Sequence, residues 1–207
     1  GEVMRYISAR QMIFDAYHEQ RGSVMAYAQE IARMGAQVQT TQRNNNDWRI
    51  VNGLEAGAVI SAVENQPAHL AALARYCFGP FTKDELAGDR ERLHTALMQV
   101  AMKIRLPGQG QSERPPVEAA RQLCWIVSAA IHHHAETTYP YNRPGLHNPR
   151  RIAAWIAQEH GEKIDIRRWS AHGRTCWRGV WEHMLDTLDR WECAALAPVA
   201  ELLPKAA

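Results

Sequence analysis

The chain has 207 residues, of which 46% are hydrophobic and 22% charged, a composition typical of a globular protein and not of a disordered chain. No apolar run approaches the ~18 residues that a membrane-spanning helix requires, and the first residues lack the basic and then apolar pattern of a signal peptide. We therefore expect a protein that contacts no membrane and stays in the cytoplasm. Its four cysteines form no Cys-x-x-Cys pair, which favours reduced thiols over a zinc ribbon or a redox pair.

The formal net charge is only +2, but the positive charge is concentrated in one stretch. Residues 141–180 contain eight Lys and Arg against three Asp and Glu, and seven of the eight basic residues are Arg. Arginine suits bidentate contacts with phosphates and base edges. A solvated helix face is the alternative interpretation of such a run.

The N-terminal half is predicted to be helical, because its apolar residues recur at helical spacing and alternating β-branched runs are absent. The pattern predicts helices over residues 8–36, 48–64, 68–78 and 83–104. The first of these is interrupted near residues 21–23, where Ser23 can cap a second segment, and Asp47 can cap the helix that follows it. Pro67 can occupy the first turn of the next helix, which stops at Gly79 and Pro80.

The clearest linker in the sequence is the Pro- and Gly-rich stretch 106–114. It predicts an N-terminal helical subdomain over residues 1–105 and a C-terminal one over residues 115–207. Pro115 and Pro116 begin a helix that runs to about Glu136, and an extended connection follows to Pro149.

Residues 150–181 have the pattern of a helix-turn-helix. A short amphipathic helix over 150–160 is expected to end at Gly161, four residues after the small Ala157. Asp165 can then cap a second helix that begins at Ile166. Three tryptophans, Trp169, Trp177 and Trp181, fall on one broad face of that helix, and we expect them to belong to the core.

The basic stretch coincides with this predicted motif, which indicates binding to double-stranded DNA. A capped helix fits the major groove, and its outward arginines reach base edges while others bind phosphates. The expected nucleic-acid-binding residues are Arg150, Arg151, Lys163, Arg167, Arg168, Ser170, His172, Arg174 and Arg178. Of these, Arg167, Arg168, Ser170 and His172 are predicted to read the bases.

Metal binding and catalysis are not predicted. His132, His133 and His134 are consecutive, and on a helix they point about 100° apart, so they do not converge on one ion. The sequence contains no phosphate-binding Gly-x-x-x-x-Gly-Lys, no Gly-x-Ser-x-Gly and no His-Glu-x-x-His. We therefore expect no cofactor and no enzymatic activity.

Three stretches resemble parts of bacteriophage late-gene transcription regulators, the Q-type antitermination proteins. The first is Gln66-Pro67-Ala68-His69-Leu70 through Arg75-Tyr76-Cys77-Phe78-Gly79-Pro80. The second runs from Ile152-Ala153-x-Trp155-Ile156 through Gly161 and Ile164-Asp165 to Trp169-Ser170. The third is Trp177-Arg178-x-x-Trp181-x-x-Met184-Leu185-x-x-Leu188 and continues to Pro198. The resemblance implies a regulator that binds DNA near a late promoter and acts on the RNA polymerase of the bacterial host, with the polymerase-contacting surface within residues 1–105.

The sequence thus favours an all-α, sequence-specific DNA-binding regulator of transcription that acts by antitermination. The alternative is a helical phage protein that binds and inhibits a host protein without binding DNA. The operator sequence, activation or repression, and a monomeric or homodimeric state are left open.

Overall fold

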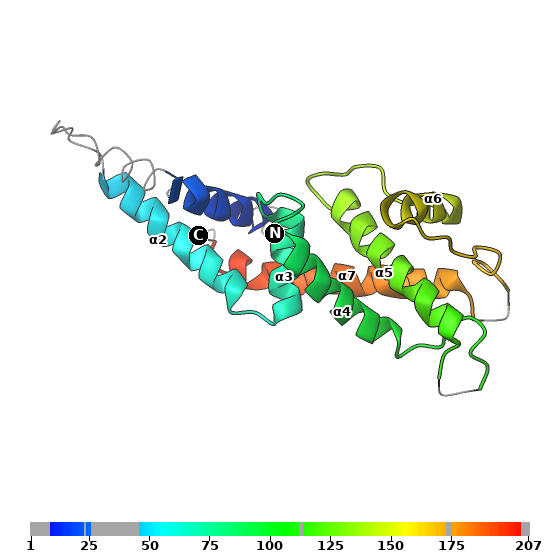
Figure 1. The fold of residues 1–207 in the computed structure, drawn as a ribbon. Coiled ribbons are helices and arrows are strands. Elements are labelled where there is room, and N and C mark those ends of the chain that lie inside the picture. Colours follow the sequence, from blue (N-terminus) through cyan, green and yellow to red (C-terminus); the bar gives the residue numbers. More distant parts are fainter. Residues whose placement is uncertain (1–8, 23, 26–45, 112–113, 173–174, 204–207) are drawn as a thin grey trace. The chain divides into compact units, whose positions relative to one another are not determined.

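The structure, a computed structural model, describes residues 9–22, 24–25, 46–111, 114–172 and 175–203 (Figure 1). These residues form helices joined by turns, and none of them lies in a β-strand, so the predicted all-α fold is confirmed. The expected cap Ser23 lies outside this description. The helix expected from Trp48 begins at Asn46, so Asp47 is its second residue and does not precede it as predicted. None of the helices in the described residues is long and apolar enough to cross a membrane.

The chain forms two compact units. Unit 1 comprises Gly1–Leu86 and Ala194–Ala207, and unit 2 comprises Ala87–Cys193. These divisions fall at other places in the sequence than the linker predicted over residues 106–114, and the predicted subdomains 1–105 and 115–207 stay a prediction.

Unit 1 contains the helical residues 9–22, helix α2 (Asn46–Glu64) and helix α3 (Ala68–Phe78). Helix α3 has the predicted bounds, with Pro67 just before its first residue. At the end of α2, Glu64 accepts a hydrogen bond from Tyr17 (2.5 Å) and pairs with Arg75 of α3 (2.7 Å). One carboxylate thus ties three helices of unit 1 together.

Unit 2 is built around helix α5 (Val117–Thr137), which packs against α4 (Ala87–Ala101) and α6 (Pro149–His160). Helix α7 (Trp177–Ala200) supplies Trp181, Met184 and Leu188 to the buried residues of this unit. The three tryptophans predicted to be core, Trp169, Trp177 and Trp181, are all buried, which confirms that prediction. No disulfide bond links the four cysteines, all of which belong to the described residues.

The second helix of the predicted helix-turn-helix is not present, and this corrects the expectation of a helix from Ile166. Helix α6 ends at Gly161 as predicted, with Gly161 in the left-handed conformation (φ 69°) that glycine adopts without strain. Residues 162–166 belong to no helix or strand, residues 167–170 form a turn, and the next helix in the described residues begins only at Trp177. Residues 173–174, which include the expected site residue Arg174, lie outside the described residues.

The reason lies in the hydrogen bonds of the chain around Trp169. A single turn closes from the Trp169 N–H to the Ile166 carbonyl (3.1 Å). The carbonyls of Arg168 and Trp169 then accept hydrogen bonds from the backbone N–H groups of Trp177 (3.4 Å) and Arg178 (2.8 Å). These two carbonyls are therefore bonded to the start of α7, where a helix would have bonded them four residues onward. Burial of the Trp169 indole against Trp181 (ring centroids 6.1 Å apart) holds this arrangement.

A buried ion pair joins α5 to α7 in unit 2. His134 of α5 and Glu192 of α7 are each about 5% exposed, and His134 Nε2 lies 2.8 Å from Glu192 Oε2 in the geometry of an ion pair. Thr138 donates a hydrogen bond to the same carboxylate oxygen (2.8 Å), and Asp189 Oδ1 lies 3.3 Å from His134 Nδ1. Burial alone lowers the pKa of His134, but the two carboxylates outweigh it and raise this pKa to about 9.

The pKa of the neighbouring His133 is shifted in the opposite direction, which favours its neutral form. Burial, together with the nearby rings of His147 and His134, lowers the pKa of His133 to about 4. Its Nδ1 accepts a hydrogen bond from the backbone N–H of Leu146 (2.8 Å), which requires this nitrogen to be unprotonated. The backbone approaches so closely here that a Cβ on Gly145 would meet His133 Nδ1 at 2.6 Å.

These two histidines predict that the free energy of unfolding is greatest near pH 6.5. An ordinary histidine has a pKa of 6.5, and the pKa of His134 is raised to about 9. The stabilisation from His134 is therefore complete below pH 6.5 and is lost as the pH rises to about 9. The lowered pKa of His133 gives a stabilisation that is present above pH 6.5 and is lost as the pH falls to about 4. Urea unfolding measured across this range tests the profile. In a His134→Gln variant the decline on the alkaline side is expected to disappear, and an unchanged alkaline decline would contradict the assignment.

Candidate nucleic-acid interface

Helix α6 begins with two exposed arginines behind a well-formed cap. The Asn148 side chain accepts a hydrogen bond from the Arg151 N–H (2.9 Å), and Pro149 occupies the first helical position. Ile152 and Ile156 bury the opposite side of the helix. Arg150 and Arg151 are exposed at the end of the helix whose dipole favours anions.

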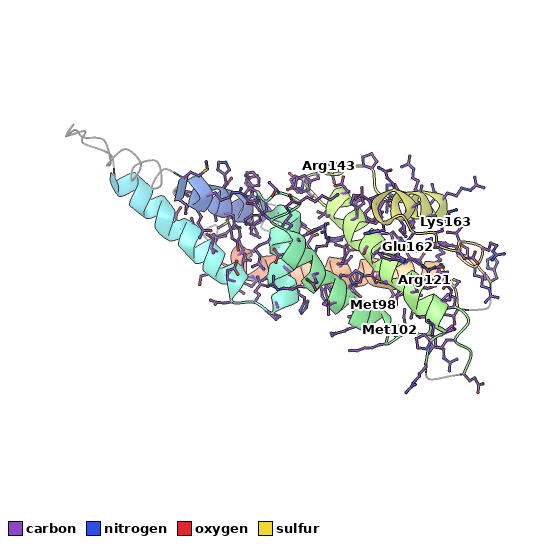
Figure 2. The ribbon with its side chains drawn as sticks, viewed as in Figure 1. Met98, Met102, Arg121, Arg143, Glu162 and Lys163 are labelled. Carbon is purple, nitrogen blue, oxygen red and sulfur yellow. The ribbon has the colours of Figure 1, made fainter. Side chains whose placement is uncertain are left out.

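The segment after α6 is fixed to α5 by one glutamine. The buried Gln122 donates to the Asp165 carbonyl and accepts from the Asp165 N–H, both at 2.9 Å. Arg121 of α5 pairs with Glu162 (2.8 Å), and Lys163 follows on the same segment (Figure 2). Lys163 is exposed and held in place through its backbone neighbours, while its own charge is directed to solvent.

Arg167 and Arg168 follow in the turn and differ in their partners. Arg167 forms two hydrogen bonds to the Asp165 carboxylate through Nε (3.0 Å) and Nη2 (2.8 Å), and its backbone N–H also donates to Asp165 (2.9 Å). These contacts lower the pKa of Asp165 to about 2. The Arg168 guanidinium makes no hydrogen bond or ion pair with the described residues. Arg167 is thus bonded directly to Asp165, whereas Arg168 acts on this carboxylate only as a nearby charge.

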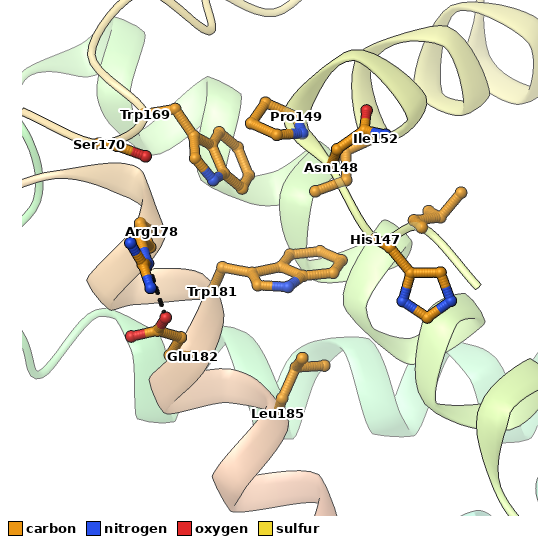
Figure 3. Close-up of a pocket in the computed structure, with 11 residues that line it drawn as sticks. His147, Asn148, Pro149, Ile152, Trp169, Ser170, Arg178, Trp181, Glu182 and Leu185 are labelled. Carbon is orange, nitrogen blue, oxygen red and sulfur yellow. Dashed lines mark hydrogen bonds and ion pairs between the residues drawn. The ribbon is translucent and has the colours of Figure 1, made fainter.

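A small pocket of about 360 Å³ brings together the start of α6, the turn at Trp169 and the start of α7 (Figure 3). Two of the predicted site residues, Ser170 and Arg178, line it. Arg178 is paired with Glu182 one helical turn later (2.8 Å). The other residues that line the pocket include Pro149 and Trp181. Segments far apart in the sequence therefore meet at this point of unit 2.

Eight of the nine predicted site residues belong to the described part of the chain, and all eight are exposed. Within the described residues, four of their cationic side chains form no ion pair or hydrogen bond: Arg150, Arg151, Lys163 and Arg168. His172 is exposed beyond the turn, and Arg174 is outside the description. Arg150 and Arg151 lie in the first turn of α6 and Lys163 follows its last residue. Arg168 precedes Trp169, which lines the pocket together with the start of α6.

Sequence reasoning missed several residues that shape this region. Asn148 could have been found, because Asn followed by Pro is a typical start of a helix. Nothing in the sequence near Gln122 indicates that it holds a segment more than forty residues away. Glu182 and His147, which line the pocket, carry no motif.

The three consecutive histidines point to three different neighbours. His132 stacks on Trp155 (ring centroids 4.6 Å), His133 contacts Trp181 (5.4 Å), and His134 pairs with Glu192. Among the described residues there is no group of three or more His, Cys, Asp or Glu side chains placed to hold a metal ion.

Comparison with known proteins gives no relative. No protein-family model, no curated protein and no solved structure matches this chain.

Proposed function

We propose that unit 2 binds double-stranded DNA and that the protein is a phage transcription regulator of the antiterminator kind. The observation that carries this proposal is the set of four exposed and unpaired cations, Arg150, Arg151, Lys163 and Arg168. A cation that already has a carboxylate partner must give it up to bind a phosphate, whereas these four lose only water and counterions.

Contacts to phosphates are the mode of binding that this arrangement supports best. Arg150 and Arg151 lie in the first turn of α6, and Lys163 comes after its last residue. The turn that carries Arg168 returns to the start of α6, because Trp169 and Ser170 line the same pocket as Pro149 and Ile152. The bases would be read by side chains of the turn, such as Ser170, and not by a recognition helix.

Action on RNA polymerase is the part of the proposal that rests on the resemblance to Q-type antitermination proteins. Unit 1 offers apolar surface for such a partner, because Phe14, Val24 and Met25 are 38%, 63% and 65% exposed. The same surface supports the second candidate, a helical phage protein that inhibits a host protein without binding DNA. Both candidate functions place the protein in the cytoplasm of a bacterial host.

Two single variants test the proposed DNA contact. Arg168→Ala is expected to weaken binding to a labelled duplex several-fold, because an available charge is removed. Arg167→Ala should have a smaller effect, since Asp165 already compensates this charge. Fluorescence anisotropy at low salt measures both. Equal effects of the two substitutions would show that the ion pair with Asp165 does not govern the contact, and no binding by the wild-type protein would favour the second candidate.

A further inference from the structure

The pocket at the start of α7 combines apolar walls with several polar groups that have hydrogen-bonding capacity to spare (Figure 3). Leu146, Ile152, Leu185 and the indole of Trp181 supply apolar surface. Binding sites for small organic groups have this character, with a few polar groups that fix the orientation of the ligand.

The polar groups of the pocket are only partly used within the described residues. The Arg178–Glu182 pair engages Arg178 Nε and one oxygen of Glu182, which leaves both Nη groups of Arg178 and the second carboxylate oxygen available. The Ser170 hydroxyl has no hydrogen-bond partner in the described part of the chain. Arg178 and Glu182 have side-chain exposures of 64% and 58%, so the pair is accessible from solvent.

We propose that this pocket binds an unpaired guanine base. Donors of Arg178 beside an acceptor of Glu182 complement the edge of guanine, on which the acceptor O6 lies next to the donors N1–H and N2–H. The apolar walls would contact the ring, as aromatic and apolar side chains do for bases taken out of a stack. Adenine, with an acceptor at N1, would face the carboxylate of Glu182 unfavourably.

The position of the pocket fits a base that belongs to a nucleic acid. Pro149 and Ile152 line the pocket and flank Arg150 and Arg151 in sequence, and Trp169 lines it next to Arg168. Three unpaired cations thus lie within one residue of the pocket lining, where they can hold the phosphates on either side of the base. This inference deepens the proposed function and rests on it for the source of the base.

Free nucleotides test the pocket without reference to DNA binding. Guanosine monophosphate is expected to bind wild-type protein in calorimetric titrations about tenfold more tightly than inosine monophosphate, which lacks the 2-amino group, and more tightly still than adenosine monophosphate. Glu182→Gln should remove this preference. Glu118→Gln is the matched control, because Glu118 is also an exposed carboxylate paired with an arginine on its own helix (2.8 Å), far in sequence from the pocket. No measurable guanosine monophosphate binding, or equal binding of the three nucleotides, would overturn the proposal.

A second arm distinguishes a base in a nucleic acid from a free nucleotide. A duplex with one bulged guanine is expected to bind more tightly than the fully paired duplex, and Glu182→Gln should abolish the difference. Equal binding of both duplexes together with guanine-selective nucleotide binding would identify a free nucleotide as the ligand. Duplex binding without any guanine preference in either arm would overturn the pocket proposal and leave the proposed function standing. Guanine-selective nucleotide binding without duplex binding would overturn the proposed function and leave the pocket proposal standing.

Discussion

Replacing Glu192 by alanine is expected to lower the free energy of unfolding by about 3–5 kcal/mol, the usual effect of removing one partner from a buried ion pair. The substitution would leave the imidazolium of His134 without its buried counter-charge and would also take away the acceptor of the Thr138 hydroxyl. Because these groups connect α5 with α7, we expect the loss to appear in the cooperative unfolding of unit 2. Chemical denaturation at pH 6.5 measures it.

Asp189→Ala is the matched control for this substitution. Asp189 contacts the same imidazole, but its side chain is 72% exposed, so its removal should cost less than about 1 kcal/mol. The double variant His134→Leu with Glu192→Leu removes both charges together and is expected to recover much of the stability lost in Glu192→Ala. Equal effects of Glu192→Ala and Asp189→Ala would contradict the importance of burial in this pair.

Replacing all four unpaired cations by alanine should reduce the affinity for duplex DNA by about 10²–10⁴-fold, because each phosphate contact adds to affinity through the release of counterions. The substituted residues are Arg150, Arg151, Lys163 and Arg168. All four are exposed and without partners among the described residues, so the fold of unit 2 should tolerate their loss. Anisotropy titration of a labelled duplex measures the change, and circular dichroism confirms that the helices remain.

The control for this variant removes the same amount of charge elsewhere in unit 2. Arg90, Lys103, Arg105 and Arg114 are also exposed, and their replacement by alanine lowers the net charge equally. A general effect of net charge would weaken binding to the same extent in both variants. The proposed interface requires that the first variant lose much more affinity than the second.

The helices around the site could be predicted from local signals in the sequence. The capped start of α6, its apolar face at Ile152 and Ile156, and Gly161 at its end are all readable within a dozen residues. Helix α5 was likewise predicted after its two prolines and begins at Val117. These features depend on neighbours in the sequence, and such signals define the type and approximate bounds of a helix.

The segment after Gly161 could not be predicted in the same way. Its Asp165 has the residue type and spacing of a helix cap, and it does bond the Arg167 N–H, but the course of the chain is decided by long-range contacts. Gln122 holds the backbone of Asp165, and the carbonyls near Trp169 bond to the start of α7. None of these partners can be identified from the spacing of residues 161–176.

The same division applies to the candidate site. That its cations are exposed follows from their residue type and their place outside the apolar face. Which of them keep their charge available does not, because Arg167 and Arg178 have carboxylate partners in the structure, whereas Arg168 has none. The pocket that includes Ser170 and Arg178 arises only when α6 and α7 come together.

The most direct test of the DNA-binding proposal is the salt dependence of duplex binding by the wild-type protein. Four phosphate contacts predict a slope of roughly −3 to −4 in a plot of log K against log salt concentration, at about −0.9 for each contact. The DNA-binding proposal predicts a slope in this range for the wild-type protein and a slope closer to zero for the variant in which all four cations are replaced by alanine. A flat response, or no binding at low salt, would contradict it.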